Sequence, residues 1–343
     1  MSKLLLKTIL GKSEIHVERG LFFKMERLLR RKYPHSRFVV ILTTNLNKIY
    51  GKQIKKQFPK SLVLPVQSGE NIKNMDTLLK LAGRLIDAGI TRQDVIIGLG
   101  GGMITDLAGF LASIYMRGIP FVAVPTTLLC MSDAAIGGKT GVDFIAKNML
   151  GTFYPAEIVI CDLDLTKSLP DRELKSGMGE IVKCAPILDP SLFRDFEKKP
   201  LNLDKIIKKC IKAKIRVIHI DPREKHLRKI LNYGHTFGHA LEAKTHYALT
   251  HGEAISIGMV ISNRIAQKLG KQKPEVDKKI KKALSRAGLP TELPKGIKVS
   301  DLANLIAKDK KRVGNQIAFI IVTKLGQPEM IKLTPKELIE LAQ

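Results

Sequence analysis

A chain of 343 residues exceeds the usual length of a single domain and offers ample material for a buried core. Its 44% hydrophobic and 26% charged residues are those of an ordinary soluble globular protein, and no window approaches the roughly 18 apolar residues of a membrane span. The 58 Lys and Arg against 32 Asp and Glu give a formal net charge of +26, which first suggests a nucleic-acid partner.

Nucleic-acid binding is nevertheless not the interpretation that the residues favour. Aromatic residues make up only 5% of the chain and Trp is absent, so the platforms on which bases stack are not indicated. The lysines are scattered along the chain and are densest in KQKPEVDKKIKKALSRAG at 271–288. A solvated, lysine-rich surface accounts for the charge, and a basic active site that attracts an anionic substrate is compatible with it.

The first twenty residues do not have the pattern of a secretory signal, because Lys7 interrupts the apolar run and no small-residue cleavage site follows. The chain contains no CxxC pair, so neither a disulfide framework nor a zinc ribbon is indicated. We therefore expect a cytoplasmic protein with reduced, mostly buried thiols at Cys130, Cys161, Cys184 and Cys210.

Predicted strands and helices alternate through the first half of the chain. This alternation predicts an α/β N-terminal domain with a mostly parallel, Rossmann-like sheet. The predicted elements are strands at 38–44, 61–66, 95–100, 120–127 and 158–164, and helices at 75–90 and 103–118.

From Pro170 onward the apolar residues take helical spacing, which predicts a mostly α-helical second domain. A shorter apolar strand follows at 316–326, and then a terminal helix with Thr334 as its N-cap. The predicted domains are residues 1–165 and residues 166–343. Ligands of open α/β sheets bind beyond the carboxyl ends of the strands, so we expect the site in the cleft between the domains.

A glycine cluster, VIIGLGGGMITD, leads from a predicted strand into a predicted helix at 95–106. Glycine lets backbone N–H groups approach phosphate oxygens closely, and a helix N-terminus favours negative charge. The cluster departs from the usual dinucleotide fingerprint because Met103 occupies the position of the third glycine. The segment indicates phosphate binding, with a simple tight turn as the alternative.

The segment DAAIGGKTGVDFIAKNMLG at 133–151 contains a Gly-Lys-Thr sequence but lacks the earlier glycine of a P-loop. We expect a turn here that presents Lys139, Lys147 and Asn148 together. Two lysines and an amide suit an anionic, polyhydroxylated ligand, although surface lysines explain the pattern almost as well.

Histidines at helical spacing give the strongest indication of chemistry. His235 and His239 stand four residues apart, with His251 and Glu253 shortly after them. Such i, i+4 histidines followed by a third are typical of a metal site, although the spacing does not say which of the three bind the ion. Upstream, GMGEIVK places Glu180 and Lys183 on one face of a predicted helix.

Taken together, these segments resemble the 3-dehydroquinate synthase family from about residue 35 to residue 315. The matching runs, in family order and at family spacing, are GGGMITDLAGF, RGIPFVAVPTTLL, DAAIGGKTGVDF, AKNMLGTFY, LPDREL, GEIVK, LNYGHTFGHALEA, HGEAISIGM and KDKK. The resemblance implies a homodimer in which an NAD-binding domain, residues 1–165, precedes a metal- and substrate-binding domain, residues 166–343.

The resemblance also implies roles for individual residues. It implies that Glu180, His235 and His251 bind a divalent metal, zinc or cobalt, and that His239 is kept for the substrate. The implied NAD contacts are Asn45, Glu70, Lys73, Gly100, Gly101, Gly102, Asp106, Thr126, Thr127, Lys139, Lys147, Ser168, Leu169 and Glu173. The implied substrate and catalytic residues are Asp133, Lys139, Lys147, Asn148, Lys183, Lys214, Arg228, Asn232, His239 and Lys310 or Lys311, with Arg117 reaching the phosphate in the neighbouring subunit.

Some positions depart from the family pattern. Thr43 replaces the usual Asp, Ala146 replaces a Gly, and Gly179 replaces an Ala; FYPA stands where the family has an FYQP-type run. These departures concern cofactor contacts more than the reaction, because no metal-binding or proton-transferring group is lost.

The reaction implied is that of a lyase of the shikimate pathway, and hence of aromatic amino acid biosynthesis. Its substrate would be 3-deoxy-D-arabino-heptulosonate 7-phosphate, converted to 3-dehydroquinate and phosphate. The implied steps are transient oxidation by NAD, elimination of phosphate, re-reduction and intramolecular aldol closure.

Three alternatives remain at this point. Another sugar phosphate cyclase would use the same scaffold on a different sugar, but Asn232, His239 and the KDKK lysines favour 3-dehydroquinate synthase. A metal-dependent polyol dehydrogenase of related fold would accumulate NADH. A basic nucleic-acid-binding protein would show steep salt dependence, but would leave the histidines and glycines unexplained.

Overall fold

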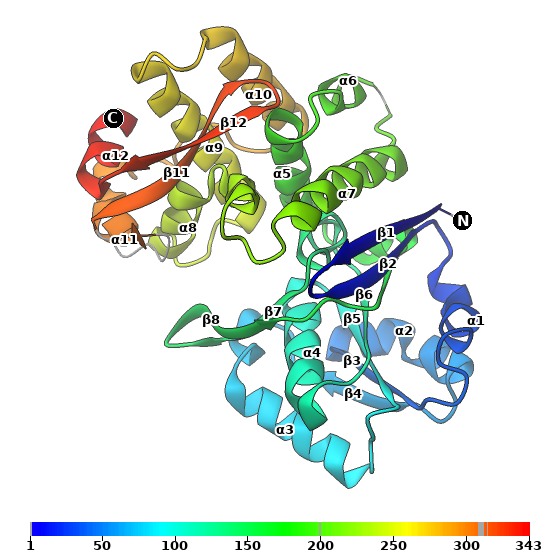
Figure 1. Ribbon diagram of the computed structural model, residues 1–343. Helices are drawn as coiled ribbons and strands as arrows, with labels where there is room; N and C mark the ends of the chain where they lie inside the picture. The colour runs from blue at the N-terminus through cyan, green and yellow to red at the C-terminus, as the bar shows by residue number, and fades with distance from the viewer. Residues whose placement is uncertain (1, 199, 308–311, 314) are drawn as a thin grey trace. The chain divides into compact units, whose positions relative to one another are not determined.

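The computed structural model describes residues 2–198, 200–307, 312–313 and 315–343, which form two compact units. The N-terminal unit comprises Met1–Leu169 and Ile218–Pro222, and the C-terminal unit comprises Pro170–Val217 and Arg223–Gln343 (Figure 1). The boundary expected from the sequence, between residues 165 and 166, falls inside the 3-10 helix η5 (Leu163–Ser168).

A seven-stranded sheet lies at the centre of the N-terminal unit (Figure 1). All neighbouring strands are parallel except the first two, which form an antiparallel hairpin at one edge. This confirms the predicted fold class. In spatial order the strands are β1 (Ser2–Thr8), β2 (Gly11–Val17), β9 (Ile158–Cys161), β6 (Phe121–Pro125), β5 (Val95–Gly100), β3 (Phe38–Thr43) and β4 (Leu62–Val66).

The four strands β9, β6, β5 and β3 are buried along their whole length. Burial on both faces explains their unbroken apolar runs, because neither face of a covered parallel sheet meets water. Helix α4 packs against β5 and β6. The helices of this unit are η1 (Phe22–Lys24), α1 (Met25–Arg30), α2 (Thr44–Gln57), η2 (Glu70–Ile72), α3 (Met75–Asp87), α4 (Gly102–Ile114), η3 (Tyr115–Arg117), η4 (Cys130–Ala134) and η5.

The segment in which we expected only a turn forms a second hairpin, with strands β7 (Lys139–Phe144) and β8 (Ala146–Phe153). Its strands approach closely because both carry glycine: a Cβ on Gly141 would lie 2.5 Å from the carbonyl oxygen of Leu150. The expected turn is therefore a strand pair with its reversal at Ile145, which takes a positive φ of 61°. This places Lys139 on β7 and Lys147 and Asn148 on β8.

The C-terminal unit is mostly helical, as predicted, with a three-stranded sheet. Its core gathers buried side chains of α8, α9, β11 and α12, and Thr334 caps α12 through a capping box with Glu337. The helices are α5 (Asp171–Ile187), α6 (Leu192–Phe196), α7 (Leu203–Ile220), η6 (Leu227–Asn232), α8 (His235–Lys244), α9 (His251–Lys268), α10 (Pro274–Arg286), η7 (Val299–Leu302), α11 (Ala303–Ala307) and α12 (Pro335–Ala342); the strands are β10 (Arg312–Val313), β11 (Gln316–Lys324) and β12 (Gln327–Leu333).

All four cysteines carry free thiols and are buried, as predicted. Burial raises the pKa of the Cys130 thiol to about 12, so this sulfur stays protonated and unreactive at neutral pH. Among the described residues, no helix is both long enough and apolar enough to cross a membrane.

Candidate active site

Helix α5 places two of the predicted residues in the interior of the C-terminal unit. Glu180 and Lys183 stand three residues apart and therefore face the same side of the helix. Their side chains are 2% and 3% exposed and form an ion pair, and the Lys183 ammonium also donates to the carbonyl of Leu231 at 2.7 Å. Because both groups are buried and partnered, the carboxylate of Glu180 is held in one orientation.

The beginnings of two other helices bring histidines to this carboxylate. His235 is the first residue of α8, after Gly234 with a positive φ of 78°, and His251 is the first residue of α9. The Nε2 atoms of His235 and His251 lie 3.6 and 3.4 Å from Oε1 of Glu180. Thr250 fixes the start of α9, since its hydroxyl forms a capping box with Glu253.

The buried Oε1 of Glu180 has no hydrogen-bond partner among the described residues. A buried carboxylate oxygen without a partner is costly and calls for a ligand. In a tetrahedral site with bonds of about 2.1 Å, neighbouring ligand atoms are separated by about 3.4 Å. The spacing of Glu180, His235 and His251 therefore suits a divalent cation that is bound by one carboxylate and two imidazoles.

The carboxylates around His251 also determine its charge. Burial opposes protonation of this imidazole, but Glu180 and Glu242 outweigh burial and raise the pKa of His251 to about 9. A cation bound by Glu180 and His251 would replace that proton, because a coordinating imidazole nitrogen must be unprotonated.

Sequence reasoning missed Glu242, whose Oε2 lies 3.3 Å from Nδ1 of His251. Its signal was present, because Glu242 follows His235 and His239 at i+7 and i+3 and therefore shares their helix face. The ring of His239 lies 5.2 Å from that of His235 and 6.0 Å from that of His251. The three predicted histidines are thus brought together, with His239 exposed at the edge of the group.

Two other predicted residues of the C-terminal unit are cations with buried side chains. Lys214 on α7 and Arg228 on η6 are 5% and 2% exposed, which is unusual for cations unless they are paired. Asn232 donates its amide to Glu224 at 2.7 Å. Glu173 lies in the first turn of α5. Lys310 and Lys311 lie outside the described residues.

In the N-terminal unit, the glycine cluster forms the turn between β5 and α4. Gly101 is the N-cap residue of α4 and supplies no side-chain cap, so backbone N–H groups begin the helix. A Cβ on Gly101 would lie 3.1 Å from the methyl group of Thr127, and Gly100 accepts a hydrogen bond from the N–H of Thr126. Gly101 therefore allows close packing against Thr127 and leaves the helix N-terminus uncovered, which suits a phosphate group.

A buried lysine joins three segments that are distant in the sequence. The ammonium of Lys73 lies 2.6 Å from Oδ2 of Asp106 and 2.5 Å from Oδ1 of Asn148. Burial would lower the pKa of Lys73, but the Asp106 carboxylate outweighs burial and raises it, so the lysine remains a cation. Lys147 on β8 lies 4.0 Å from Glu70. Four predicted cofactor residues therefore gather here, and of these Lys147 is also a predicted substrate residue, as is Asn148.

The other predicted residues of this unit lie on turns and helix ends. Asn45 is in the first turn of α2, which Thr43 caps by accepting the N–H of Leu46. Thr43, which departs from the family pattern, therefore stabilises the start of α2. Ser168 ends η5 and donates to Leu165, and Leu169 follows it. Lys139 begins β7, Asp133 lies in η4, and exposed Arg117 ends η3 with a positive φ of 66°.

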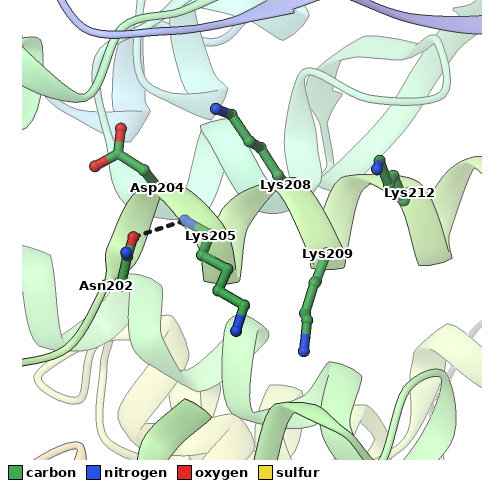
Figure 2. A pocket seen from close by; sticks show the side chains of 6 residues that line it. All are labelled: Asn202, Asp204, Lys205, Lys208, Lys209 and Lys212. Atoms are coloured by element: carbon green, nitrogen blue, oxygen red, sulfur yellow. Dashed lines mark hydrogen bonds between the residues drawn. The ribbon is translucent and has the colours of Figure 1, made fainter. Parts of the chain in front are cut away.

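A separate hollow lies along α7 and contains none of the predicted residues. Lys205, Lys208, Lys209 and Lys212 line it, with Asn202 and Asp204. Figure 2 shows Lys205 and Lys209 pointing to one side of the helix and Lys208 to the other. Lys205 and Lys209 form ion pairs with buried Asp195 at 2.9 and 2.5 Å, so half of the lysines in this hollow already have a counter-charge.

The chain matches family models and curated relatives along most of its length. The model of the 3-dehydroquinate synthase N-terminal domain matches residues 63–176, and that of the C-terminal domain matches residues 177–312. A 3-dehydroquinate synthase from Alkaliphilus metalliredigens is 40% identical over 317 residues, which cover 88% of this chain and 88% of the relative.

Two solved structures share the fold at lower identity. A 2-deoxy-scyllo-inosose synthase complexed with carbaglucose-6-phosphate, NAD+ and Co2+ has a TM-score of 0.90 at 26% identity, and the match covers 99% of each chain. A 2-epi-5-epi-valiolone synthase from Streptomyces hygroscopicus subsp. jinggangensis with NAD+ and Zn2+ bound has a TM-score of 0.85 at 26% identity, over 96% of this chain and 94% of that one.

Proposed function

The chain belongs to the 3-dehydroquinate synthase family, and from this premise we propose how its own residues perform that family's reaction. The protein is an NAD- and metal-dependent lyase that converts 3-deoxy-D-arabino-heptulosonate 7-phosphate to 3-dehydroquinate and phosphate. The observation that carries this function is the buried Oε1 of Glu180, which lies beside two histidine nitrogens and has no hydrogen-bond partner in the described part of the chain. Such a donor set is typical of a catalytic metal site that keeps positions open for substrate oxygens.

Residues 166–343 hold the divalent cation and supply most substrate contacts, and residues 1–165 supply most NAD contacts. Glu180, His235 and His251 bind the cation, zinc or cobalt. Asn45, Lys73, Asp106 and the backbone of Gly100–Gly102 contact NAD, together with the remaining cofactor residues predicted above. When bound, the cation supplies a Lewis acid for substrate oxygens and NAD supplies a reversible hydride acceptor.

Lys183 prepares the metal site before the substrate arrives. Its ion pair with Glu180 and its hydrogen bond to Leu231 hold the carboxylate so that Oε1 faces the two histidines. A carboxylate whose direction is fixed loses little further freedom when it coordinates a cation. Lys183 is therefore a positioning residue for the ligand set, in addition to its proposed contact with the substrate.

The substrate carries a carboxylate and a phosphate, so the site needs fixed cations and hydrogen-bond donors. Lys214 and Arg228 meet this need from buried positions, and Asn232 and His239 add polar groups beside the histidines. Cations held in place by their surroundings bind anions without a large loss of side-chain entropy. We assign these four side chains, with Lys139 and Asn148, to orientation of the substrate.

The protein is proposed to act as a homodimer in which Arg117 contacts the phosphate bound by the neighbouring subunit. Two features support this assignment. Arg117 is exposed, and it stands in a turn with positive φ at both Met116 and Arg117. A residue held in such a sparsely populated conformation at the surface is a candidate for a functional contact.

The proposed function is tested by measuring phosphate release from the heptulosonate phosphate while NADH absorbance is followed at substoichiometric NAD. We expect many turnovers of phosphate without net NADH, abolished by His251→Ala and retained by His35→Ala, which replaces an exposed histidine. Stoichiometric NADH would indicate a dehydrogenase. Phosphate release from another sugar phosphate, but not from this one, would indicate a different cyclase.

A further inference from the structure

Glu242 is a buried carboxylate beside the three proposed metal ligands. It lies on α8, seven residues after His235, and is 5% exposed. Its Oε2 atom is 3.3 Å from Nδ1 of His251, the first residue of α9. A buried carboxylate is expensive unless it is partnered, so its place beside an imidazole has a structural or chemical reason.

The two nitrogens of His251 face two different carboxylates. Nε2 lies 3.4 Å from Oε1 of Glu180, and Nδ1 faces Glu242. A neutral imidazole carries only one N–H, and the nitrogen without it offers the lone pair that binds a cation. If the N–H is on Nδ1 and points to Glu242, then Nε2 is left unprotonated toward Glu180 and His235.

His235 shows the same arrangement with a different acceptor. Its Nδ1 lies 3.2 Å from the backbone carbonyl of Tyr233, and its Nε2 faces Oε1 of Glu180 at 3.6 Å. A carbonyl oxygen only accepts, so Nδ1 of His235 must be the donor. Both histidines therefore have an acceptor behind them and present Nε2 to the same oxygen, although one acceptor is a peptide carbonyl and the other is Glu242.

We propose that Glu242 is a positioning residue that fixes the Nδ1–H tautomer and the ring orientation of His251. The proposal rests on the proposed function in one respect, namely that Glu180, His235 and His251 hold the cation. By accepting a hydrogen bond from Nδ1–H, the carboxylate keeps Nε2 available and makes it more basic, which strengthens the bond to a cation. Glu242 does not itself bind the cation held by Glu180.

A second metal site is the competing interpretation of the same residues. Ligand atoms of His239, Glu242 and His251 also lie within 4.8 Å of one another. With one cation already on Nε2, a second cation beside Glu242 would take Nδ1 of His251, and the ring would then have to lose both protons. The two interpretations differ in metal stoichiometry, since the positioning role requires one cation per chain.

The experiment measures binding of Co2+ and Zn2+ to metal-free protein by competition with a chromophoric chelator. Glu242→Gln keeps an acceptor oxygen without charge, and Glu242→Met keeps the length of the side chain without an acceptor. We expect one site per chain, with Kd raised about tenfold in the Gln variant and about 100-fold in the Met variant. The visible spectrum of bound Co2+ should change in the same order, because it reports the geometry of the ligands.

Glu253→Gln is the matched control, because Glu253 is two residues from His251 but contacts Arg172 and Thr250 instead. Its Kd should stay within about threefold of the wild type. Unchanged affinity in Glu242→Met would overturn the proposal, and so would two cations per chain with one lost in that variant. These measurements need no substrate, so an error in the assigned reaction would leave their outcome unaffected.

A second measurement uses the wild type alone, in case Glu242→Met does not fold. In the zinc-bound protein with 15N-labelled histidine, NMR should show the proton of His251 on Nδ1. A proton on Nε2, or zinc on Nδ1, would overturn the assignment.

Discussion

Gly252 on α9 packs directly against the backbone of Ser176 on α5. Its N–H donates to the Ser176 hydroxyl at 3.1 Å, and a Cβ built on Gly252 would overlap the Ser176 carbonyl oxygen. A Cβ on Gly179, one turn further along α5, would lie 2.7 Å from the Cα of Gly252. The two helices can cross this closely only because both positions lack side chains, and the crossing adjoins Glu180 and His251.

Replacing Gly252 by Ala should therefore destabilise the protein and weaken the proposed metal site together. The added methyl group meets backbone rather than a movable side chain, so α5 and α9 must separate. We expect a loss of about 3 kcal/mol in the free energy of unfolding, measured with urea, and a raised Kd for Zn2+.

Gly83→Ala is the matched control: Gly83 lies in α3 with open space around its Cα, so this substitution should stabilise the protein by about 0.5–1 kcal/mol. Equal stability of the Gly252→Ala variant and the wild type would contradict the packing argument.

Lys73 should be required for both stability and NAD binding. In Lys73→Met, the carboxylate of Asp106 loses its cation, and Asn148 loses a hydrogen-bond donor. Removing one member of a fully buried pair costs about 3–5 kcal/mol, and we expect about 2 kcal/mol because Asp106 is 21% exposed. Fluorescence titration with NADH should show weaker binding.

Two further variants separate charge from packing at this position. Lys80→Met replaces an exposed lysine on the neighbouring helix α3 and should change neither property. Lys73→Met combined with Asp106→Leu should recover part of the lost stability, because no unpaired carboxylate remains. Weak NADH binding should persist in the double variant if the polar groups themselves contact the cofactor.

Asp94 should make the stability of the N-terminal unit sensitive to acid. Burial alone would raise the pKa of Asp94, but hydrogen bonds from Thr91 and Arg37 outweigh burial and hold the pKa below its usual value. The ionised carboxylate therefore stabilises the fold above the unfolded-state pKa of about 3.9. That contribution is lost as the pH falls through the lower pKa of the folded state.

Comparison of the wild type with Asp94→Asn by urea unfolding isolates this effect from other carboxylates. We expect the variant to be less stable by about 1–3 kcal/mol at pH 7, and the difference to shrink below about pH 4. Asp171→Asn serves as the control, because the Asp171 side chain is 74% exposed. A difference that is the same at pH 3 as at pH 7 would show that the charge of Asp94 is not what stabilises this region.

The strands of the central sheet were predictable from the sequence, because strands that are buried on both faces are apolar at every position. The runs FVVILT and VIIGLG are apolar at every position, since β3 and β5 are covered on both faces. Likewise, the spacing of His235 and His239 reflects the turn of α8, and the structure places both beside His251. Local periodicity was sufficient for these elements because each is determined by its own residues.

Contacts between segments that are distant in the sequence produce no local pattern from which they could be predicted. Lys73 meets Asp106 and Asn148 across 33 and 75 residues, and no local pattern indicates which lysine of such a lysine-rich chain is buried. The β7–β8 hairpin was missed because β8 is largely exposed and lacks a continuous apolar face. For Glu242, the spacing shows that it shares the helix face of His235 and His239, but its partner, His251, begins another helix, so only the folded unit shows their contact.

Arg117 provides a direct test of the proposed homodimer. If Arg117 serves the site of the neighbouring subunit, then each active site contains residues of two chains. Arg117→Asn removes the cation but keeps a residue that tolerates positive φ, so the turn should persist. We expect a strong loss of phosphate release, mainly through a raised KM for the substrate, with metal affinity unchanged.

Hybrid dimers distinguish a contact across the interface from one within the chain. Arg117→Asn and His251→Ala should each have little activity alone. In a hybrid made by co-expression, one site would combine the intact His251 of the first chain with the intact Arg117 of the second. Random pairing in a two-fold symmetric dimer makes about half of the dimers hybrid, each with one complete site of two, so about a quarter of wild-type activity should return. If Arg117 acts within its own chain, every site lacks one of the two residues and no activity returns.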